Sequence, residues 1–185
     1  MTINNNSYIT IGDDSNPTLL LIHGLASNKH TWNVIIPFLK KYYYIVSIDL
    51  PGHGQNSESY SDFSYKNVVD YIANLQARLN LNFDYIAGHS YGASVATSVS
   101  FDSRFNIKKI ALLDGGMIPM KLIPEMNQEN YKTRLSPPDF TNRKFESISD
   151  FIDKNLSLKS NPHIKAIKYA ILSNFDHTLK PKLVL

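Results

Sequence analysis

The stretch Gly-His-Ser-Tyr-Gly at residues 88–92 lies between a short apolar run, residues 84–87, and a segment rich in small residues, 92–100. This arrangement predicts a serine at a turn from a strand into a helix. Such a turn strains the backbone of its central residue, Ser90, and the two flanking glycines supply the space that the turn needs. We therefore expect the Ser90 hydroxyl at the carboxyl edge of a sheet, where open α/β sheets bind ligands.

The segments on either side of this stretch alternate between two hydrophobic patterns. Continuous apolar runs bounded by turn residues predict buried strands at Thr18–Ile22, Tyr43–Ile48, Asp84–Ala87 and Lys109–Leu113, with a possible edge strand at Tyr8–Ile11. Apolar residues at spacings of three and four predict helices at Thr31–Lys40, Tyr65–Leu79 and Gly92–Ser100. Strands that alternate with helices indicate an α/β fold with a mostly parallel sheet and helices on both faces.

The pattern changes after Gly116. Residues 117–127 mix apolar residues with two prolines, and two helices in series are predicted at Ser147–Leu156 and Pro162–Phe175. Two helices without a strand between them favour an insertion over the sheet. We therefore expect a core at residues 1–116 and a helical cap region at 117–185.

Composition excludes several classes of function. The chain has 185 residues, a length typical of one domain, with 43% hydrophobic and 19% charged residues. The net charge is only +3 and the basic residues are scattered, so we do not expect a nucleic-acid partner. There is no cysteine, no clustered set of histidines and carboxylates, and no glycine-rich phosphate loop. We therefore expect no metal and no cofactor.

Nothing in the sequence indicates a membrane or a secreted location. Residues 1–6 have neither the basic start nor the apolar core of a signal peptide, and the longest apolar runs are far too short to span a bilayer. We expect a soluble, cytoplasmic protein. The sequence does not indicate an oligomeric state.

Two further loops follow predicted strands. His23-Gly24-Leu25 follows the first long strand, and Asp49-Leu50-Pro51-Gly52-His53-Gly54 follows the second. Proline and glycine force a sharp exit from the second strand, and Asp49 can cap the turn, so we expect a structural role for Asp49. We expect His23 to be a hydrogen-bonded structural residue and His53 to pack within its loop.

These two loops and the serine turn resemble, in order and spacing, the α/β-hydrolase superfamily, in its single-domain branch with a cap. The resemblance covers Tyr8 to Gly116. It implies that Ser90 is the nucleophile and that the backbone N–H groups of Leu25 and Tyr91 form the oxyanion hole. Asp114, at the end of the last predicted strand, also fits the family pattern, and residues from Met117 onward resemble the helical cap that shapes the substrate pocket.

The chain departs from the family after the cap. Complete members continue with two more strands that usually deliver the catalytic acid and then the histidine. Here the only histidines after Ser90 are His163 and His177, both in the predicted cap, where the fold would not supply a base. The chain is thus expected to be a C-terminally truncated α/β-hydrolase fold. Asp114 is a possible acid, although a structural or pocket-lining role is favoured.

The resemblance implies a serine hydrolase that acts on an ester or a similar acyl group of a small molecule through Ser90. A serine hydroxyl needs an adjacent base, so autonomous activity depends on a histidine that the sequence does not supply. Two alternatives remain open: a catalytically inactive truncated fragment, and a family member that cleaves C–C bonds or hydrolyses lactones.

Overall fold

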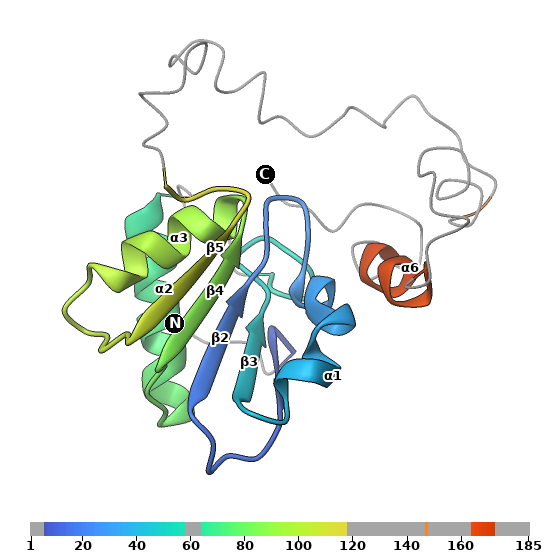
Figure 1. Ribbon diagram of the computed structural model, residues 1–185. Helices are drawn as coiled ribbons and strands as arrows, with labels where there is room; N and C mark the ends of the chain where they lie inside the picture. The colour runs from blue at the N-terminus through green and yellow to red at the C-terminus, as the bar shows by residue number, and fades with distance from the viewer. Residues whose placement is uncertain (1–5, 58–63, 118–146, 148–163, 173–185) are drawn as a thin grey trace, which may run out of the picture.

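The computed structural model describes residues 6–57, 64–117, 147 and 164–172 (Figure 1). The helix expected at Ser147–Leu156 therefore lies outside the described residues, apart from Ser147. Most of the region expected as a cap, 117–185, also lies outside them, and α6 (Ile164–Leu172) is its one described helix. This helix lies within the segment Pro162–Phe175, for which a helix is predicted.

Five strands form one sheet in the order β1-β3-β2-β4-β5. Their bounds are Tyr8–Ile11 for β1, Thr18–Ile22 for β2, Tyr44–Ile48 for β3, Tyr85–His89 for β4 and Lys109–Leu113 for β5. Strand β1 pairs antiparallel with β3, and the other pairs are parallel. The mostly parallel sheet expected from the sequence is confirmed, and the carboxyl ends of β2, β3, β4 and β5 meet at one edge (Figure 1).

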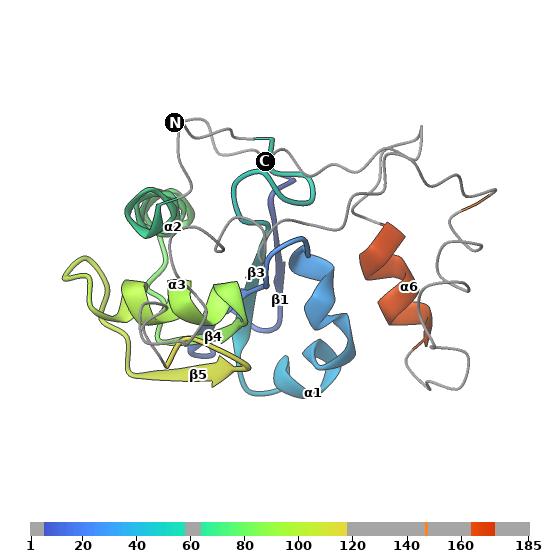
Figure 2. The same cartoon turned by 90° about the horizontal axis from the view of Figure 1, so that it is seen from above.

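Helices cover both faces of the sheet, as the sequence predicts. Helices α2 (Tyr65–Leu79) and α3 (Tyr91–Ser100) lie on one face, and the 3-10 helix η1 (Lys29–Val34) and α1 (Ile36–Leu39) lie on the other (Figure 2). The side chains of β2 alternate between two hydrophobic clusters. Leu20 and Ile22 pack toward α2 and α3, whereas Leu19 and Leu21 pack toward η1 and α1. Burial on both faces explains why β2 is a continuous apolar run.

The longest helix, α2, begins and ends at recognisable signals. The Ser64 hydroxyl accepts a hydrogen bond from the Asn67 N–H at 3.4 Å, and the helix ends at Asn80, whose φ of 52° is left-handed. Val68, Ile72 and Leu75 repeat at helical spacing and are buried against the sheet.

The helix predicted over Thr31–Lys40 is wrong as a single element. The structure has the 3-10 helix η1 followed by the four-residue helix α1, with Pro37 at the start of the second. A proline has no N–H to donate and is favoured in the first turn of a helix, so it starts a new element here. Trp32 is buried against Leu21 and Ile36, which places its ring in the core between η1 and the sheet.

Candidate active site

Ser90 lies at the turn between β4 and α3, as expected from its sequence motif. Its φ is 51° and its ψ is −116°, a conformation that a residue with a side chain rarely adopts. Such a residue costs about 1–3 kcal/mol, which the surrounding structure must offset. One restraint is the hydrogen bond from the Ser90 N–H to the Leu113 carbonyl of β5, at 2.8 Å.

Neither of the two flanking glycines, Gly88 and Gly92, has room for a Cβ atom. A Cβ on Gly88 would lie 2.2 Å from the Gly92 carbonyl oxygen. A Cβ on Gly92 would lie 2.4 Å from the carbonyl oxygens of Ile22 and His23 at the end of β2. The first turn of α3 is therefore packed against the backbone of β2, and this packing holds the strained turn at the sheet edge.

The structure brings the loop of Leu25 next to Ser90. A Cβ on Gly24 would lie 3.2 Å from the Ser90 Cβ, so the backbone that leads into Leu25 passes directly beside the serine. The loop bends at Ala26, with φ 57°, and the Ser27 N–H donates to the Gly24 carbonyl at 3.3 Å. Leu25 and Tyr91, far apart in sequence, thus flank the same serine.

Asp114 lies in the turn that follows β5 and is exposed. Its φ is 52°, and a Cβ on the following Gly115 would lie 2.8 Å from the Ser90 carbonyl oxygen. The turn that carries Asp114 is therefore packed on the serine turn. No hydrogen bond of the Asp114 carboxylate to another described residue is found.

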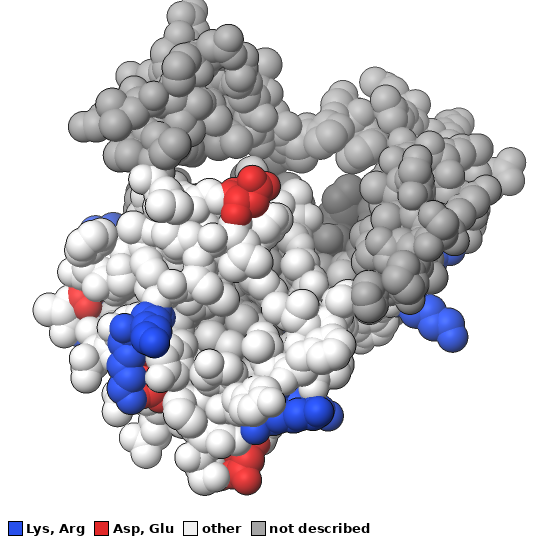
Figure 3. All heavy atoms as spheres, viewed as in Figure 1, with Lys and Arg blue, Asp and Glu red and all other residues white. Residues whose placement is uncertain are grey.

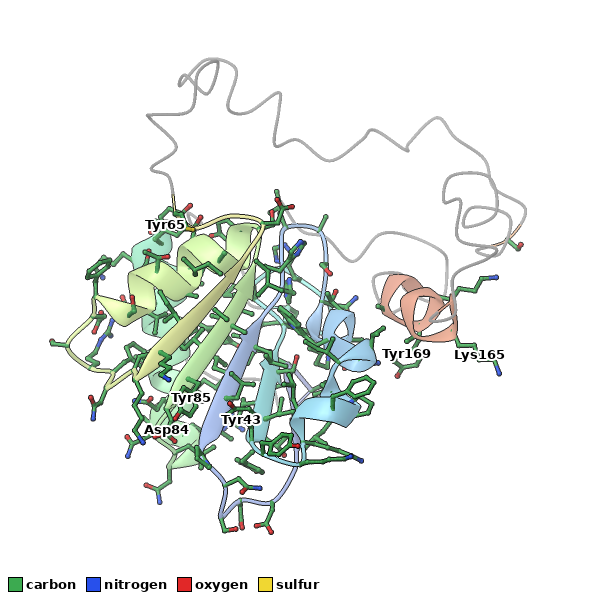
Figure 4. All side chains as sticks on the ribbon, in the orientation of Figure 1. Tyr43, Tyr65, Asp84, Tyr85, Lys165 and Tyr169 are labelled. Carbon is green, nitrogen blue, oxygen red and sulfur yellow. The ribbon has the colours of Figure 1, made fainter. Side chains whose placement is uncertain are left out.

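Tyr91 is half-buried, and its ring stacks on that of Tyr65 at the start of α2, with centroids 5.7 Å apart and an interplanar angle of 21°. Figure 4 shows Tyr65 at the same end of the sheet as the serine turn. The stack ties the residue after the serine to the helix layer on that face.

The model of the α/β-hydrolase family matches residues 19–170 of this chain. The chain belongs to this family.

Several relatives that match this chain are longer than it. An (E)-2-((N-methylformamido)methylene)succinate hydrolase of Acinetobacter baylyi is 35% identical over 97 residues, which are 52% of this chain and 37% of that protein. A bacterial membrane phospholipase A of solved structure is 30% identical with a TM-score of 0.56, over 60% of this chain and 37% of that one. A marine microorganism esterase shares the fold, with 20% identity and a TM-score of 0.67 over 99% of this chain and 69% of that one. The chain spans less than two fifths of the first of these relatives.

His23 is a structural residue of the hydrolase fold in this chain. Its Nδ1–H donates to the Gly24 carbonyl at 2.7 Å, and its Nε2 accepts the Leu50 N–H at 3.0 Å. These two bonds join the loops after β2 and β3 and require the neutral imidazole. Burial, followed by the nearby His53, lowers the pKa of His23 to about 3.

The loop after β3 is organised by Asp49, in agreement with the role expected from the sequence. The buried carboxylate accepts the N–H of Lys29 at 2.7 Å and that of Gln55 at 2.9 Å, and it pairs with the Lys29 ammonium at 2.5 Å. Sequence reasoning missed Lys29, which is only 3% exposed, because lysine is ordinarily a surface residue. His53 packs in this loop as expected and donates Nδ1–H to the Pro51 carbonyl at 2.9 Å.

Within the part of the chain that the structure describes, no histidine ring is hydrogen-bonded to the Ser90 hydroxyl. His163 and His177 lie outside the described residues. Neither a cluster of metal-binding side chains nor a helix long and apolar enough to cross a membrane is found among the described residues. On the face shown in Figure 3, the lysines, arginines and acidic residues are scattered, in line with the scattered basic residues of the sequence.

The buried neutral His23 makes stability depend on pH. Its folded pKa of about 3 lies below the ordinary value of 6.5, so as the pH falls the unfolded chain binds this proton first. The stability that His23 contributes is complete above pH 6.5 and is lost progressively toward pH 3. Urea unfolding between pH 7.5 and 4.5 should show a steeper loss for the native chain than for His23→Gln, by up to about 1.4 kcal/mol per pH unit. Parallel losses in the two proteins would contradict this prediction.

Proposed function

We propose that this chain carries the nucleophile of a serine hydrolase that acts on an ester or a similar acyl group of a small molecule. The observation that carries the proposal is the backbone of Ser90, which is left-handed and lodged between two glycines that admit no side chain. A serine with a merely structural role gains nothing from this strain, whereas strained residues of this kind are concentrated at active sites.

Under this proposal the Ser90 oxygen attacks the acyl carbon, and the charge on the carbonyl oxygen is stabilised by the N–H groups of Leu25 and Tyr91. Collapse of this intermediate expels the leaving group, which takes a proton, and leaves an acyl ester on Ser90. Water then attacks this ester and releases the acid. Each backbone donor of such an oxyanion hole contributes about 3–4 kcal/mol to stabilisation of the transition state. The N-terminus of α3 adds a favourable dipole.

The proton of Ser90 needs an acceptor, and His23 cannot serve, because both of its ring nitrogens are hydrogen-bonded to backbone. No other described histidine ring is hydrogen-bonded to the Ser90 hydroxyl either, so we propose that the base lies outside the described residues. Asp114 is the candidate acid, because its turn is packed against that of Ser90. The same proposal divides the chain into a core, residues 1–116, and a helical cap, residues 117–185.

The relatives support hydrolysis as the reaction class. Both relatives of at least 30% identity reported above carry the names of hydrolases, one for a succinate derivative and one for phospholipids. The two names specify different substrates. They therefore support a shared nucleophile and oxyanion hole, and they do not indicate which acyl group this chain would act on.

A fluorophosphonate probe tests the nucleophile directly. We expect the purified chain to be labelled at Ser90, since the probe forms a bond to an activated serine oxygen, and labelling should fall to background in Ser90→Ala. Intact-protein mass spectrometry with peptide mapping measures both. The matched control is Ser94→Ala, one turn further along α3, which should be labelled at the native rate.

Two outcomes would count against the proposal. Labelling that persists in Ser90→Ala would place the reactive group elsewhere, and a folded chain without any labelling would show that Ser90 is not activated in this chain. The role of Asp114 predicts slower labelling in Asp114→Asn, with Asp14→Asn in the loop before β2 as its control. Equal rates in these two variants would remove Asp114 from the site.

A further inference from the structure

Asn28 joins two helical segments with the two halves of one side-chain amide. Its Oδ1 accepts the His30 N–H at 2.9 Å and so caps the N-terminus of η1. Its Nδ2 donates to the Ala170 carbonyl of α6 at 2.6 Å, across 142 positions of sequence. Asn28 is 1% exposed, so neither bond competes with bulk water.

The carbonyl that Asn28 reaches is one that α6 cannot satisfy internally. The last four carbonyl groups of an α-helix have no N–H partner within the helix, and Ala170 is among the last four residues of α6 (Ile164–Leu172). Asn28 therefore caps the start of η1 and the end of α6 at the same time. The Asn28 amide can make both hydrogen bonds only when α6 lies in this docked position.

A ring contact lies beside this hydrogen bond. His30 of η1 and Tyr169 of α6 meet edge to face, with centroids 4.8 Å apart and an interplanar angle of 81°. Figure 4 shows Tyr169 on the side of α6 that faces η1 and α1, and Figures 1 and 2 both place α6 beside these segments. Two neighbouring residues of α6 thus contact two residues of one short segment, 28–30.

This segment is the far end of the loop that carries Leu25. The loop begins at Gly24, whose backbone passes beside Ser90, and it ends at Lys29, which is held by the buried Asp49. Between these two ends lies Asn28, and its hydrogen bond to Ala170 connects α6 directly to the loop, next to the His30–Tyr169 contact.

We propose that Asn28 is a positioning residue that couples the docking of α6 to the order of the loop carrying Leu25. This inference rests on the proposed role of Leu25 in the oxyanion hole. Docked α6 holds the loop in place beside Ser90, and release of α6 loosens it. Because coupling between two sites is reciprocal, loosening the loop also releases α6.

The isosteric variant Asn28→Asp separates the two halves of the amide. A carboxylate still accepts the His30 N–H and keeps the cap of η1, but it cannot donate to Ala170, and it sets an oxygen against that carbonyl. Hydrogen exchange of the full chain, read by mass spectrometry, should show about tenfold faster exchange in residues 164–172 and in residues 24–31. Exchange in β4 should stay at the native rate. The control is Asn82→Asp, the same chemical change in an exposed loop before β4.

The reverse variant, Tyr169→Ala, leaves Asn28 in place and should speed exchange in residues 24–31 as well. Native exchange in α6 of Asn28→Asp, or native exchange in residues 24–31 of Tyr169→Ala, would overturn the coupling. Where Ser90 is labelled by fluorophosphonate, Asn28→Asp should slow labelling about tenfold, and an unchanged rate would overturn the positioning role. A native chain that is not labelled at all contradicts the proposed function instead, and the exchange measurements still decide the coupling.

Discussion

Alanine at Gly92 should destabilise the chain by about 3 kcal/mol or more, which corresponds to a fall in Tm of about 6–12 °C for a protein of this size. Gly92 is in the first turn of α3, where alanine ordinarily favours the helix over glycine by about 1 kcal/mol. Here the added Cβ would lie 2.4 Å from the backbone carbonyl oxygens of Ile22, the last residue of β2, and of His23, which cannot move without separating the helix from the sheet. The steric term is the larger, so the net effect is destabilising.

Gly24→Ala is the matched control for this prediction. The nearest atom to its Cβ, at 3.0 Å, is Nδ1 of the His89 side chain, which can shift more easily than backbone. We expect the control to lose less than half as much stability in thermal and urea unfolding. A Gly92→Ala variant as stable as the native chain would show that α3 does not pack on β2 as closely as described.

Asp49→Asn should cost about 3–5 kcal/mol, because it leaves the buried Lys29 ammonium without its carboxylate. The two charged groups are 2.5 Å apart, and their side chains are 3% and 0% exposed. Asparagine has nearly the same shape, so the loss reports charge and hydrogen bonding rather than packing. Urea unfolding at pH 7 measures it, and the loop after β3 should be the region that becomes accessible to protease.

Asp70→Asn provides the comparison on the surface. Asp70 pairs with Lys66 and Arg104, both well exposed, and pairs of this kind contribute about 0–1 kcal/mol. Similar losses in Asp49→Asn and Asp70→Asn would mean that the Lys29–Asp49 pair is not a principal support of the two loops.

Much of the fold follows from local signals in the sequence. Strands β2, β3 and β4 are continuous apolar runs because both faces of the sheet are covered there, and the serine turn is marked by its glycines. The burial expected for Lys109–Leu113 is wrong: this segment forms the edge strand β5, and most of its residues are exposed. The other misjudged segment is Thr31–Lys40, where apolar spacing alone predicts one helix. In the structure, burial of Trp32 and the missing N–H of Pro37 divide this segment into two elements. The spacing of the apolar residues does not indicate that division.

By itself, the sequence determined that a serine stands at a strand-to-helix turn, since the glycines, the strand and the helix around Ser90 are neighbours along the chain. The tertiary structure alone decided which distant residues contact that turn and the loop that carries Leu25. The approach of Gly24, the Lys29–Asp49 pair and the bond from Asn28 to Ala170 each depend on parallel strands and docked helices that bring distant segments together. A lysine or an asparagine carries no local mark of such a contact, because its partner is fixed by the register of the sheet and the packing on it.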